Sequence, residues 1–296
     1  MTTNANEIEC IALSGDVCGE GPVWHPEQRA LYWTDINRFL VHRFAPDSRT
    51  THTWIFEEPV TSVNLTTDPD RLLLVFGSCV GLWSPLTHPC IKTIYRLSDA
   101  PGMRFNDARI DPRGSLWVGT MRNNVGNFGE DLDVSFENGV LYRIDPDGNG
   151  SEWKHGIGIS NTVAWSPNLM TFYFGDTSAN ALYQFDYDLR NGEISNERPF
   201  LVSYPHGVPD GSAIDSEGFL WNTRPGARRL IRVAPDGSVD RTIDLPVLRP
   251  TSCAFGGEGL KTLYITTARS ADELSGSVFA LRTESGGCPE NRFRLL

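Results

Sequence analysis

Internal repeats are the feature of this sequence that most restricts its fold. A polar residue, a short alternation of apolar residues and a turn recur along the chain in that order. The four clearest copies are Glu20–Pro26, Asn106–Pro112, Asn161–Pro167 and Asp210–Ser216. Each turn is followed by a second run of strand-forming residues that starts with a large apolar side chain. These second runs start at Leu31, Leu116, Phe172 and Leu220.

Two weaker copies start at Ser62 and Ser252, so the chain contains six units whose starts lie 42 to 55 residues apart. This is the period of four-stranded propeller blades. Amphipathic helix patterns of a dozen residues or more are missing from the sequence, which argues against α/β folds. We therefore expect an all-β, six-bladed β-propeller with four-stranded blades, formed by residues 1–296 as a single domain.

A propeller must also close into a ring. The segment Glu7–Leu13 precedes the first unit and has the composition of a strand. We expect it to supply the outer strand of the last blade, whose other strands should lie between Ser252 and about Arg294. Such closure removes the exposed sheet edges that favour aggregation.

The six units start with polar residues, and the innermost strands of a propeller line its channel. Their starting residues should therefore meet around one axis: Glu20, Ser62, Asn106, Asn161, Asp210 and Ser252. Two buried carboxylates would repel each other unless a cation lies between them. Ligation by Glu20, Asp210 and the side-chain carbonyl of Asn161 suits Ca²⁺, Mg²⁺ or Mn²⁺, and Zn²⁺ and Fe²⁺ also accept such ligands. The alternative is that these residues bond to backbone groups and water in the channel.

Several longer motifs, in order along nearly the whole chain, resemble those of the gluconolactonase, regucalcin (senescence marker protein) and luciferin-regenerating-enzyme family of six-bladed propellers. They include Gly19–Trp24, Arg104–Asp107 followed by Gly119–Met121, Ser160–Pro167, Pro209–Gly211 and Phe255–Gly257. The resemblance implies that Glu20, Asn161 and Asp210 bind one divalent metal ion. It also implies that Arg104 and Asn106 line the substrate pocket.

One position departs from the family pattern. Better-known relatives have an acidic residue a few positions after Gly-Thr-Met, whereas this chain has Asn124 at the matching place. An amide donates as well as accepts hydrogen bonds, so we expect Asn124 to change how substrate hydroxyl groups are recognised. The following stretch, Val125–Gly139, is either a lid or a solvated loop.

A divalent ion with open coordination positions predicts hydrolysis, because it polarises an ester carbonyl and lowers the pKa of water. We expect a lactonase in which Asp210 also orients or deprotonates the attacking water. Sugar-acid lactones are the leading substrate class through the resemblance. The alternatives are hydrolysis of another ester or an organophosphate, and a calcium-binding propeller without catalytic activity.

The charge balance restricts the partners. With 26 Lys and Arg against 37 Asp and Glu, the formal net charge is −11, which argues against nucleic acid and anionic membranes as partners. No apolar run approaches the roughly 18 residues of a membrane span. The polar, acidic stretch Met1–Cys10 lacks the pattern of an export signal, so we expect a cytoplasmic protein. We expect it to be a monomer or a weak homo-oligomer.

Arg224, Arg228 and Arg229 are interpreted as solvated hairpin residues, with a contact to an anionic substrate group as the alternative.

Overall fold

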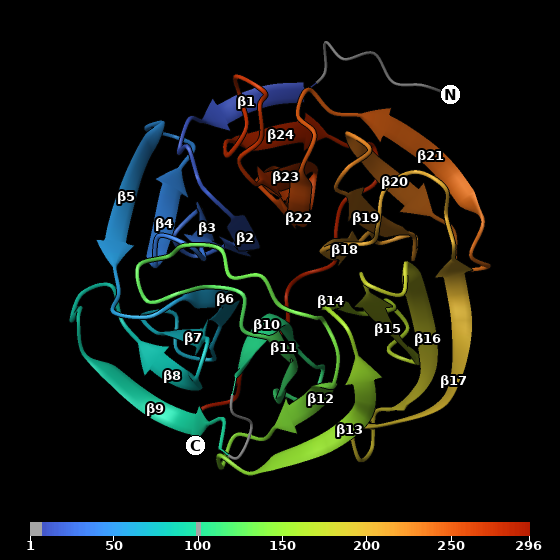
Figure 1. Ribbon diagram of the computed structural model, residues 1–296, viewed down its shortest axis with the longest axis horizontal. Helices are drawn as coiled ribbons and strands as arrows, with labels where there is room; N and C mark the ends of the chain where they lie inside the picture. The colour runs from blue at the N-terminus through green and yellow to red at the C-terminus, as the bar shows by residue number, and fades with distance from the viewer. Residues whose placement is uncertain (1–7, 99–101) are drawn as a thin grey trace.

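Six four-stranded antiparallel sheets stand around a central channel in the computed structural model of the protein, which describes residues 8–98 and 102–296 (Figure 1). The architecture confirms the all-β propeller with six four-stranded blades. No helix in the described part of the chain is long and apolar enough to cross a membrane.

The first three blades are each made of four consecutive strands, with the innermost strand first. Blade 1 contains β2 (Gly19–His25), β3 (Ala30–Asp35), β4 (Leu40–Ala45) and β5 (Thr50–Ile55). Blade 2 contains β6 (Val60–Leu65), β7 (Leu72–Phe76), β8 (Cys79–Trp83) and β9 (Ile91–Arg96). Blade 3 contains β10 (Met103–Ile110), β11 (Leu116–Arg122), β12 (Gly139–Ile144) and β13 (Gly150–Ile157).

Blades 4 and 5 follow the same plan, whereas blade 6 combines both ends of the chain. Blade 4 contains β14 (Ser160–Trp165), β15 (Thr171–Asp176), β16 (Ala181–Asp188) and β17 (Glu193–Val202). Blade 5 contains β18 (Ser212–Ile214), β19 (Leu220–Arg224), β20 (Arg229–Val233) and β21 (Val239–Asp244). Blade 6 contains β22 (Pro250–Gly256), β23 (Thr262–Thr267), β24 (Val278–Arg282) and β1 (Ile8–Ala12), with the short 3₁₀ helix η2 (Glu258–Leu260) after β22.

The repeated turn after each inner strand has a structural role that explains its sequence. Asp111 follows β10, and its carboxylate accepts a hydrogen bond from Nε1 of the buried Trp117 over 3.1 Å. Asp215 does the same for Trp221 over 2.9 Å in blade 5. A buried indole N–H requires an acceptor, so these turns hold the large aromatic side chains of the second strands in the core.

The ring closes where β1 pairs with β24 in antiparallel register from Ile8 opposite Leu281 to Ala12 opposite Val278. This confirms the predicted role of the N-terminal segment for residues 8–12, while Glu7 lies outside the described residues. The other three strands of blade 6 agree with the expected range of Ser252 to about Arg294, and the last of them from this end of the chain stops at Arg282.

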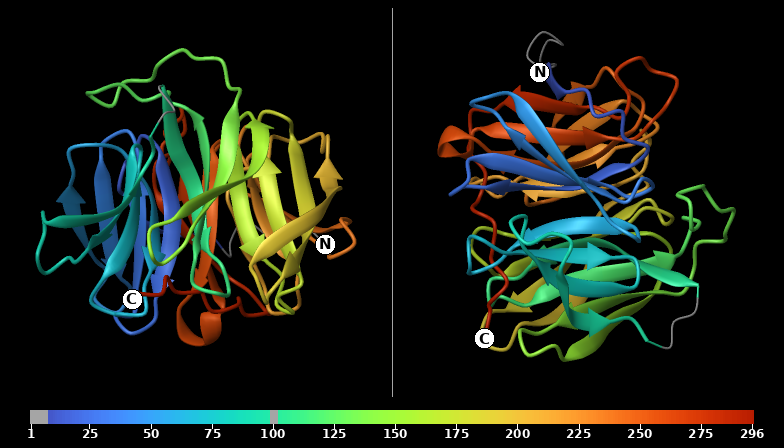
Figure 2. Two further views of the ribbon diagram at one scale, coloured as in Figure 1. Left: turned by 90° about the horizontal axis from the view of Figure 1, so that it is seen from below. Right: turned by 90° about the vertical axis from the view of Figure 1, so that its left-hand side faces the viewer.

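The residues after β24 instead form a C-terminal segment, Thr283–Leu296, that crosses the face opposite the loop between β11 and β12 (Figure 2). Its backbone bonds to Ile214 in blade 5 through Cys288, and to Leu65 in blade 2 through Phe293. Phe293 is fully buried, so this segment packs into the fold rather than adding a strand to blade 6.

Candidate functional site

Irregularities in the inner strands set the direction of the candidate site residues. The pairing register shifts between Glu20 and Val23 in β2, and between Asn161 and Val163 in β14. In β10 the shift lies between Phe105 and Ala108 and therefore includes Asn106. Such bulges interrupt the alternation of a strand and redirect side chains, and they occur often beside active sites.

A chain of hydrogen bonds joins the side chains at the start of blades 3 and 4. Asn106 accepts from Arg104 Nη1 and donates from Nδ2 to Asn161 Oδ1 over 3.1 Å. Asn161 in turn donates from Nδ2 to Thr177 Oγ1 over 2.8 Å, and Thr177 donates to the carbonyl of Pro209. Pro209 directly precedes Asp210, so this chain reaches the start of blade 5. We refer to this end of the channel as the mouth.

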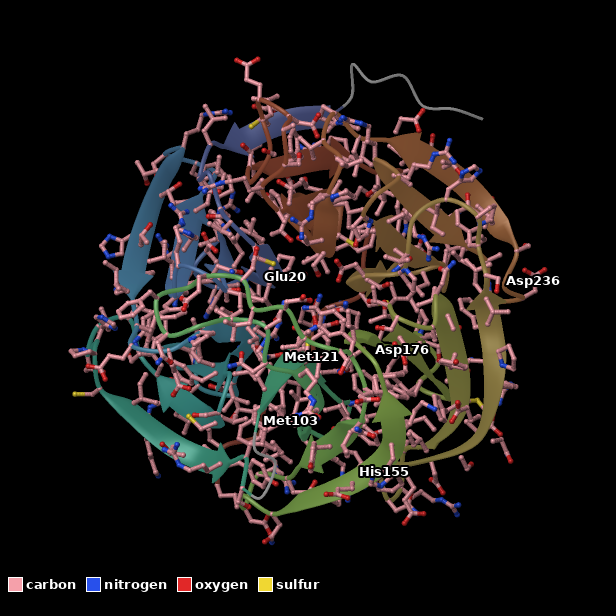
Figure 3. All side chains as sticks on the ribbon, in the orientation of Figure 1. Glu20, Met103, Met121, His155, Asp176 and Asp236 are labelled. Atoms are coloured by element: carbon pink, nitrogen blue, oxygen red, sulfur yellow. The ribbon has the colours of Figure 1, made fainter. Side chains whose placement is uncertain are left out.

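Glu20 and Asp210 lie close enough at the mouth to repel each other electrostatically. Glu20 is seen beside the channel in Figure 3. Burial, together with the nearby Asp107 carboxylate, raises the pKa of Glu20 to about 8. Burial and the charges of Glu20 and Asp107 also raise the pKa of Asp210. Three carboxyl groups thus share a region in which their ionised forms are costly.

Two glycines allow these acids to approach the neighbouring blades. Gly21 follows Glu20 with φ of +53°, and a Cβ there would lie 2.8 Å from Cα of Ser62. Gly211 follows Asp210, and a Cβ there would lie 2.1 Å from Oγ of Ser252. The predicted ring positions Ser62 and Ser252 therefore provide small side chains against which the neighbouring glycines pack.

The donor types at the mouth fit a hard divalent cation. No three His, Cys, Asp or Glu side chains in residues 8–98 and 102–296 form a group that would hold a metal ion. The candidate set contains two carboxylates, Glu20 and Asp210, and needs the amide oxygen of Asn161 as its third ligand. That oxygen accepts one hydrogen bond from Asn106 and has a second lone pair. A divalent cation would also offset the repulsion between the two carboxylates.

Asn124 contacts the predicted substrate residue Arg104. Its Oδ1 accepts hydrogen bonds from Nε of Arg104 over 3.1 Å and from Nη2 over 2.8 Å. Arg104 is 5% exposed, and burial lowers the pKa of its guanidinium to about 10. The guanidinium therefore remains charged at neutral pH, next to the carboxyl groups of the mouth.

The loop between β11 and β12 passes over the mouth from blade 3 to blade 1 (Figures 1 and 2). Asn37, in the turn between β3 and β4, donates from Nδ2 to the carbonyl of Gly129 over 2.9 Å and to Asp131 over 3.0 Å. The tip of the loop exposes Phe128. The stretch Val125–Gly139 is thus a loop attached at both sides of the mouth.

Sequence reasoning missed two charged residues near the mouth. Asp107 is 8% exposed, and its carboxyl group helps to raise the pKa of both Glu20 and Asp210. Arg224 is 1% exposed, so its interpretation as a solvated hairpin residue is wrong. Its guanidinium donates to the carbonyl of Gly207 over 2.8 Å and to Asn180 over 2.9 Å, and it stacks on the ring of Tyr204. The loop before Asp210 covers Arg224, a tertiary contact that no local pattern indicates.

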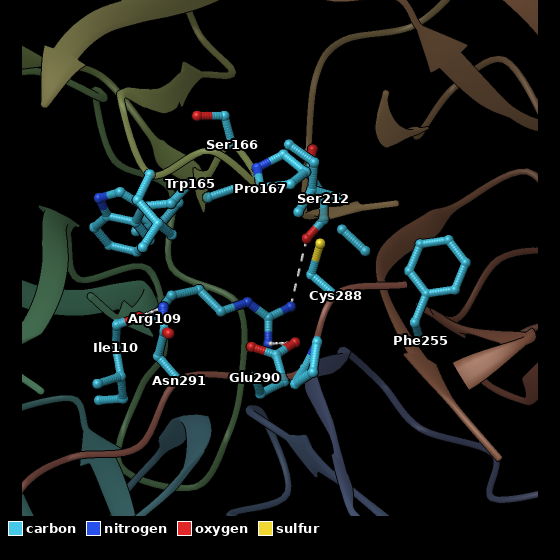
Figure 4. Close-up of a pocket in the computed structure, with 16 residues that line it drawn as sticks. Arg109, Ile110, Trp165, Ser166, Pro167, Ser212, Phe255, Cys288, Glu290 and Asn291 are labelled. Carbon is cyan, nitrogen blue, oxygen red and sulfur yellow. Dashed lines mark hydrogen bonds and ion pairs between the residues drawn. The ribbon is translucent and has the colours of Figure 1, made fainter. Parts of the chain in front are cut away.

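Arg109 closes the channel below the mouth. Its guanidinium reaches across from blade 3 to the carbonyls of Pro22 and Cys253, over 3.1 and 3.2 Å, and pairs with Glu290 of the C-terminal segment over 3.5 Å. A cavity of about 320 Å³ adjoins Arg109 at the far ends of the inner strands, where Trp165 and Ile214 lie (Figure 4). This cavity lies away from the predicted site residues, all of which are at the mouth or over it.

Comparisons with known proteins identify the family of the chain. The family described as SMP-30/Gluconolactonase/LRE-like region matches residues 18–269. The chain is 33% identical over 297 residues to the 6-deoxy-6-sulfogluconolactonase of Pseudomonas putida, covering 97% of this chain and 98% of the relative. It is 31% identical over 287 residues to the pentonolactonase XacC of Haloferax volcanii, covering 93% and 94%. The solved structure of regucalcin from Agrobacterium tumefaciens, described as a calcium-binding protein, superposes with a TM-score of 0.88 at 27% identity and 97% coverage of both chains.

The chain therefore belongs to the SMP-30/gluconolactonase/LRE-like family, as its motifs predicted. Its homologues include lactonases.

Proposed function

We propose that the protein is a metal-dependent lactonase that opens a sugar-acid lactone. The observation that supports this proposal is that the charges of Glu20 and Asp210 act on each other at one mouth of the channel. The hydrogen bonds that run from Arg104 through Asn106 and Asn161 toward Pro209 lead to the same mouth. Two relatives of nearly full length are named as a pentonolactonase and a 6-deoxy-6-sulfogluconolactonase, which supports a sugar lactone as the substrate.

In this proposal Glu20, Asp210 and Asn161 hold one divalent cation. The cation supplies Lewis acidity, which polarises an ester carbonyl and lowers the pKa of a water molecule. The oxygen donors suit Ca²⁺, Mg²⁺ and Mn²⁺, and Zn²⁺ and Fe²⁺ also accept them. Calcium has support from the relative described as a calcium-binding protein.

Residues of the chain activate the water and position the substrate. Asp210 orients the attacking water and receives its proton as the new bond to the carbonyl carbon forms. The ring C–O bond then breaks, and a proton must reach the departing oxygen to give the hydroxy acid. Arg104 and Asn106 bind oxygen atoms of the substrate and keep its carbonyl in register with the water.

The test is acid release from a panel of aldonolactones by protein that has been stripped of metal and reloaded with each candidate cation. We expect turnover with at least one cation and its loss in Asp210→Asn. Asp133→Asn makes the same change of charge in the exposed part of the loop and should retain activity. Cation binding without hydrolysis of any lactone or other ester would instead establish a calcium-binding propeller without catalytic activity.

A further inference from the structure

The hydrogen bonds of Arg104 all go to neutral acceptors. Its guanidinium donates to Asn124 Oδ1 twice, to Asn106 Oδ1 over 2.6 Å and to the carbonyl of Phe105 over 2.9 Å. Within residues 8–98 and 102–296 it forms no ion pair. These four bonds use four of its five N–H groups, which leaves one N–H of Nη2 available.

The same contacts fix the orientation of the Asn124 amide. Arginine has no acceptor, so the amide atom that faces Arg104 must be the oxygen. The Nδ2 group of Asn124 then points away from Arg104, and it donates to no other described residue. Together, Nη2 of Arg104 and Nδ2 of Asn124 form what we call the donor patch, which presents only hydrogen-bond donors. An acidic residue at position 124 would instead present acceptors and cancel the charge of Arg104.

Arg104 has no carboxylate within ion-pair distance among the described residues, although the charge of Glu20 stabilises its guanidinium from further away. A divalent cation at Glu20 and Asp210 would balance the two carboxylates. Arg109 has Glu290 at 3.5 Å and is also stabilised by the charge of Asp107. Arg104 is then a buried cation beside the mouth with neutral acceptors, and a buried charge is costly unless it is paired.

We propose that the protein prefers lactones that carry an oxyanion substituent, a carboxylate, sulfonate or phosphate, away from the reacting carbonyl, and that the donor patch binds this group. An oxyanion accepts hydrogen bonds and carries a charge opposite to that of Arg104, whereas a hydroxyl group can accept from the same donors but carries no charge. This inference rests on the proposed lactone hydrolysis and adds the charge of the substrate.

The first test compares lactones that differ in one substituent: D-glucono-1,4-lactone with D-glucaro-1,4-lactone, and D-glucono-1,5-lactone with its 6-phosphate. Because charge-assisted hydrogen bonds contribute about 1.5 to 3 kcal/mol, we expect kcat/KM to favour the anionic member by about tenfold or more. The carboxylate and phosphate pairs distinguish the two kinds of oxyanion. Increasing the salt concentration should reduce the preference.

Asn124→Asp tests the patch itself, because it replaces the two amide donors with a charged acceptor of the same size. We expect the preference for the anionic member to fall by about tenfold or more. Asn127→Asp introduces the same charge at an exposed position of the same loop and should leave the preference unchanged. Equal kcat/KM within each pair for the wild-type protein would overturn the inference while leaving lactone hydrolysis intact.

A measurement of ligand binding tests this inference independently of the proposed lactone hydrolysis. Methyl β-D-glucopyranosiduronate and methyl β-D-glucopyranoside differ in the carboxylate and contain no lactone to hydrolyse. Calorimetry on the metal-loaded protein should show tighter binding of the glycoside that carries the carboxylate, and Asn124→Asp should remove the difference. If no lactone is hydrolysed, the proposed function fails, and this comparison still decides the anion site. Equal affinity for the two glycosides contradicts it.

Discussion

Asn106 donates a hydrogen bond from Nδ2 to Oδ1 of Asn161 across the boundary between blades 3 and 4. Asn161 also donates to Thr177, so the positions of its oxygen and nitrogen are both determined by neighbours. The oxygen proposed to bind the cation is therefore oriented by a residue that is itself proposed to bind substrate. Changes at Asn106 should consequently affect both metal affinity and KM.

Metal binding should depend on the two carboxylates of the mouth. We expect the wild-type protein to bind one divalent ion, and the double variant Glu20→Gln/Asp210→Asn to lose this binding, because amides neither carry charge nor attract a cation as strongly as carboxylates. Elemental analysis and calorimetric titration measure both. Asp133→Asn, which removes one exposed carboxylate, is the control. Unchanged affinity in the double variant would place the ligands elsewhere.

The stability of the metal-free protein should depend on pH in a defined direction. The pKa of Glu20 is raised from 4.5 to about 8 in the fold, so between these values the folded protein holds a proton that the unfolded chain releases. The free energy of unfolding should therefore fall as pH rises from about 4.5 to about 8. Urea unfolding in the presence of a chelator measures this trend.

Two comparisons test the cause of that trend. Glu20→Gln has no carboxyl group to ionise at this position, so the free energy of unfolding of this variant should fall less over the same pH range. Adding the divalent cation should stabilise the wild-type protein most at the upper end of the range, where the carboxylates are ionised. The same pH dependence in the wild-type protein and in Glu20→Gln would show that Glu20 is not responsible.

Gly211 should be intolerant of a side chain. A Cβ at this position would lie 2.1 Å from Oγ of Ser252 and 2.8 Å from its Cα. Gly211→Ala should lower the free energy of unfolding by about 1 to 3 kcal/mol through overpacking. Adding Ser252→Gly should restore part of the loss, because it removes the closest atoms and leaves the Cα. Gly77→Ala, with its nearest neighbour at 3.7 Å, is the control for an ordinary contact.

The loop over the mouth should depend on Asn37 for its attachment to blade 1. Asn37→Ala removes the hydrogen bonds to Gly129 and Asp131, so proteases should cut residues 123–138 faster. If the loop helps to retain substrate, KM should rise, by up to about tenfold, with a smaller change in kcat. Asn149→Ala removes a hydrogen bond to Asp147 in a distant turn and serves as the control. Unchanged proteolysis would mean that Asn37 does not hold the loop.

The repeats predicted the blades because each unit repeats the same local pattern. In each unit a polar residue near the start of the inner strand precedes a large apolar residue near the start of the second strand by 10 or 11 residues. The two-residue period of β structure explains the omission of Asp107. Strict alternation places adjacent residues on opposite faces, but the register shift between Phe105 and Ala108 lets Asp107 act on the same region as Asn106.

Long-range contacts account for the other differences between the predictions from sequence and the structure. Arg224 is buried by a loop that precedes it by about 20 residues, and its own hairpin has the composition of an exposed turn. The sequence patterns indicated no position for the C-terminal segment, in which the backbone of Phe293 bonds to Leu65 of blade 2, more than two hundred residues earlier in the chain. Neither contact has a periodic signal, since each depends on how blades are placed around the ring.

The pairing of β1 with β24 has a consequence for the order in which the protein folds. Each of the first five blades consists of consecutive strands, so it can form as soon as its own hairpins have been synthesised. Residues Ile8–Ala12 have no partner until Val278–Arg282 exist. Contacts between such distant segments form slowly, because a long chain must be ordered before they give any stabilisation. Of the described strands, β1 is therefore synthesised before the others but pairs only after them.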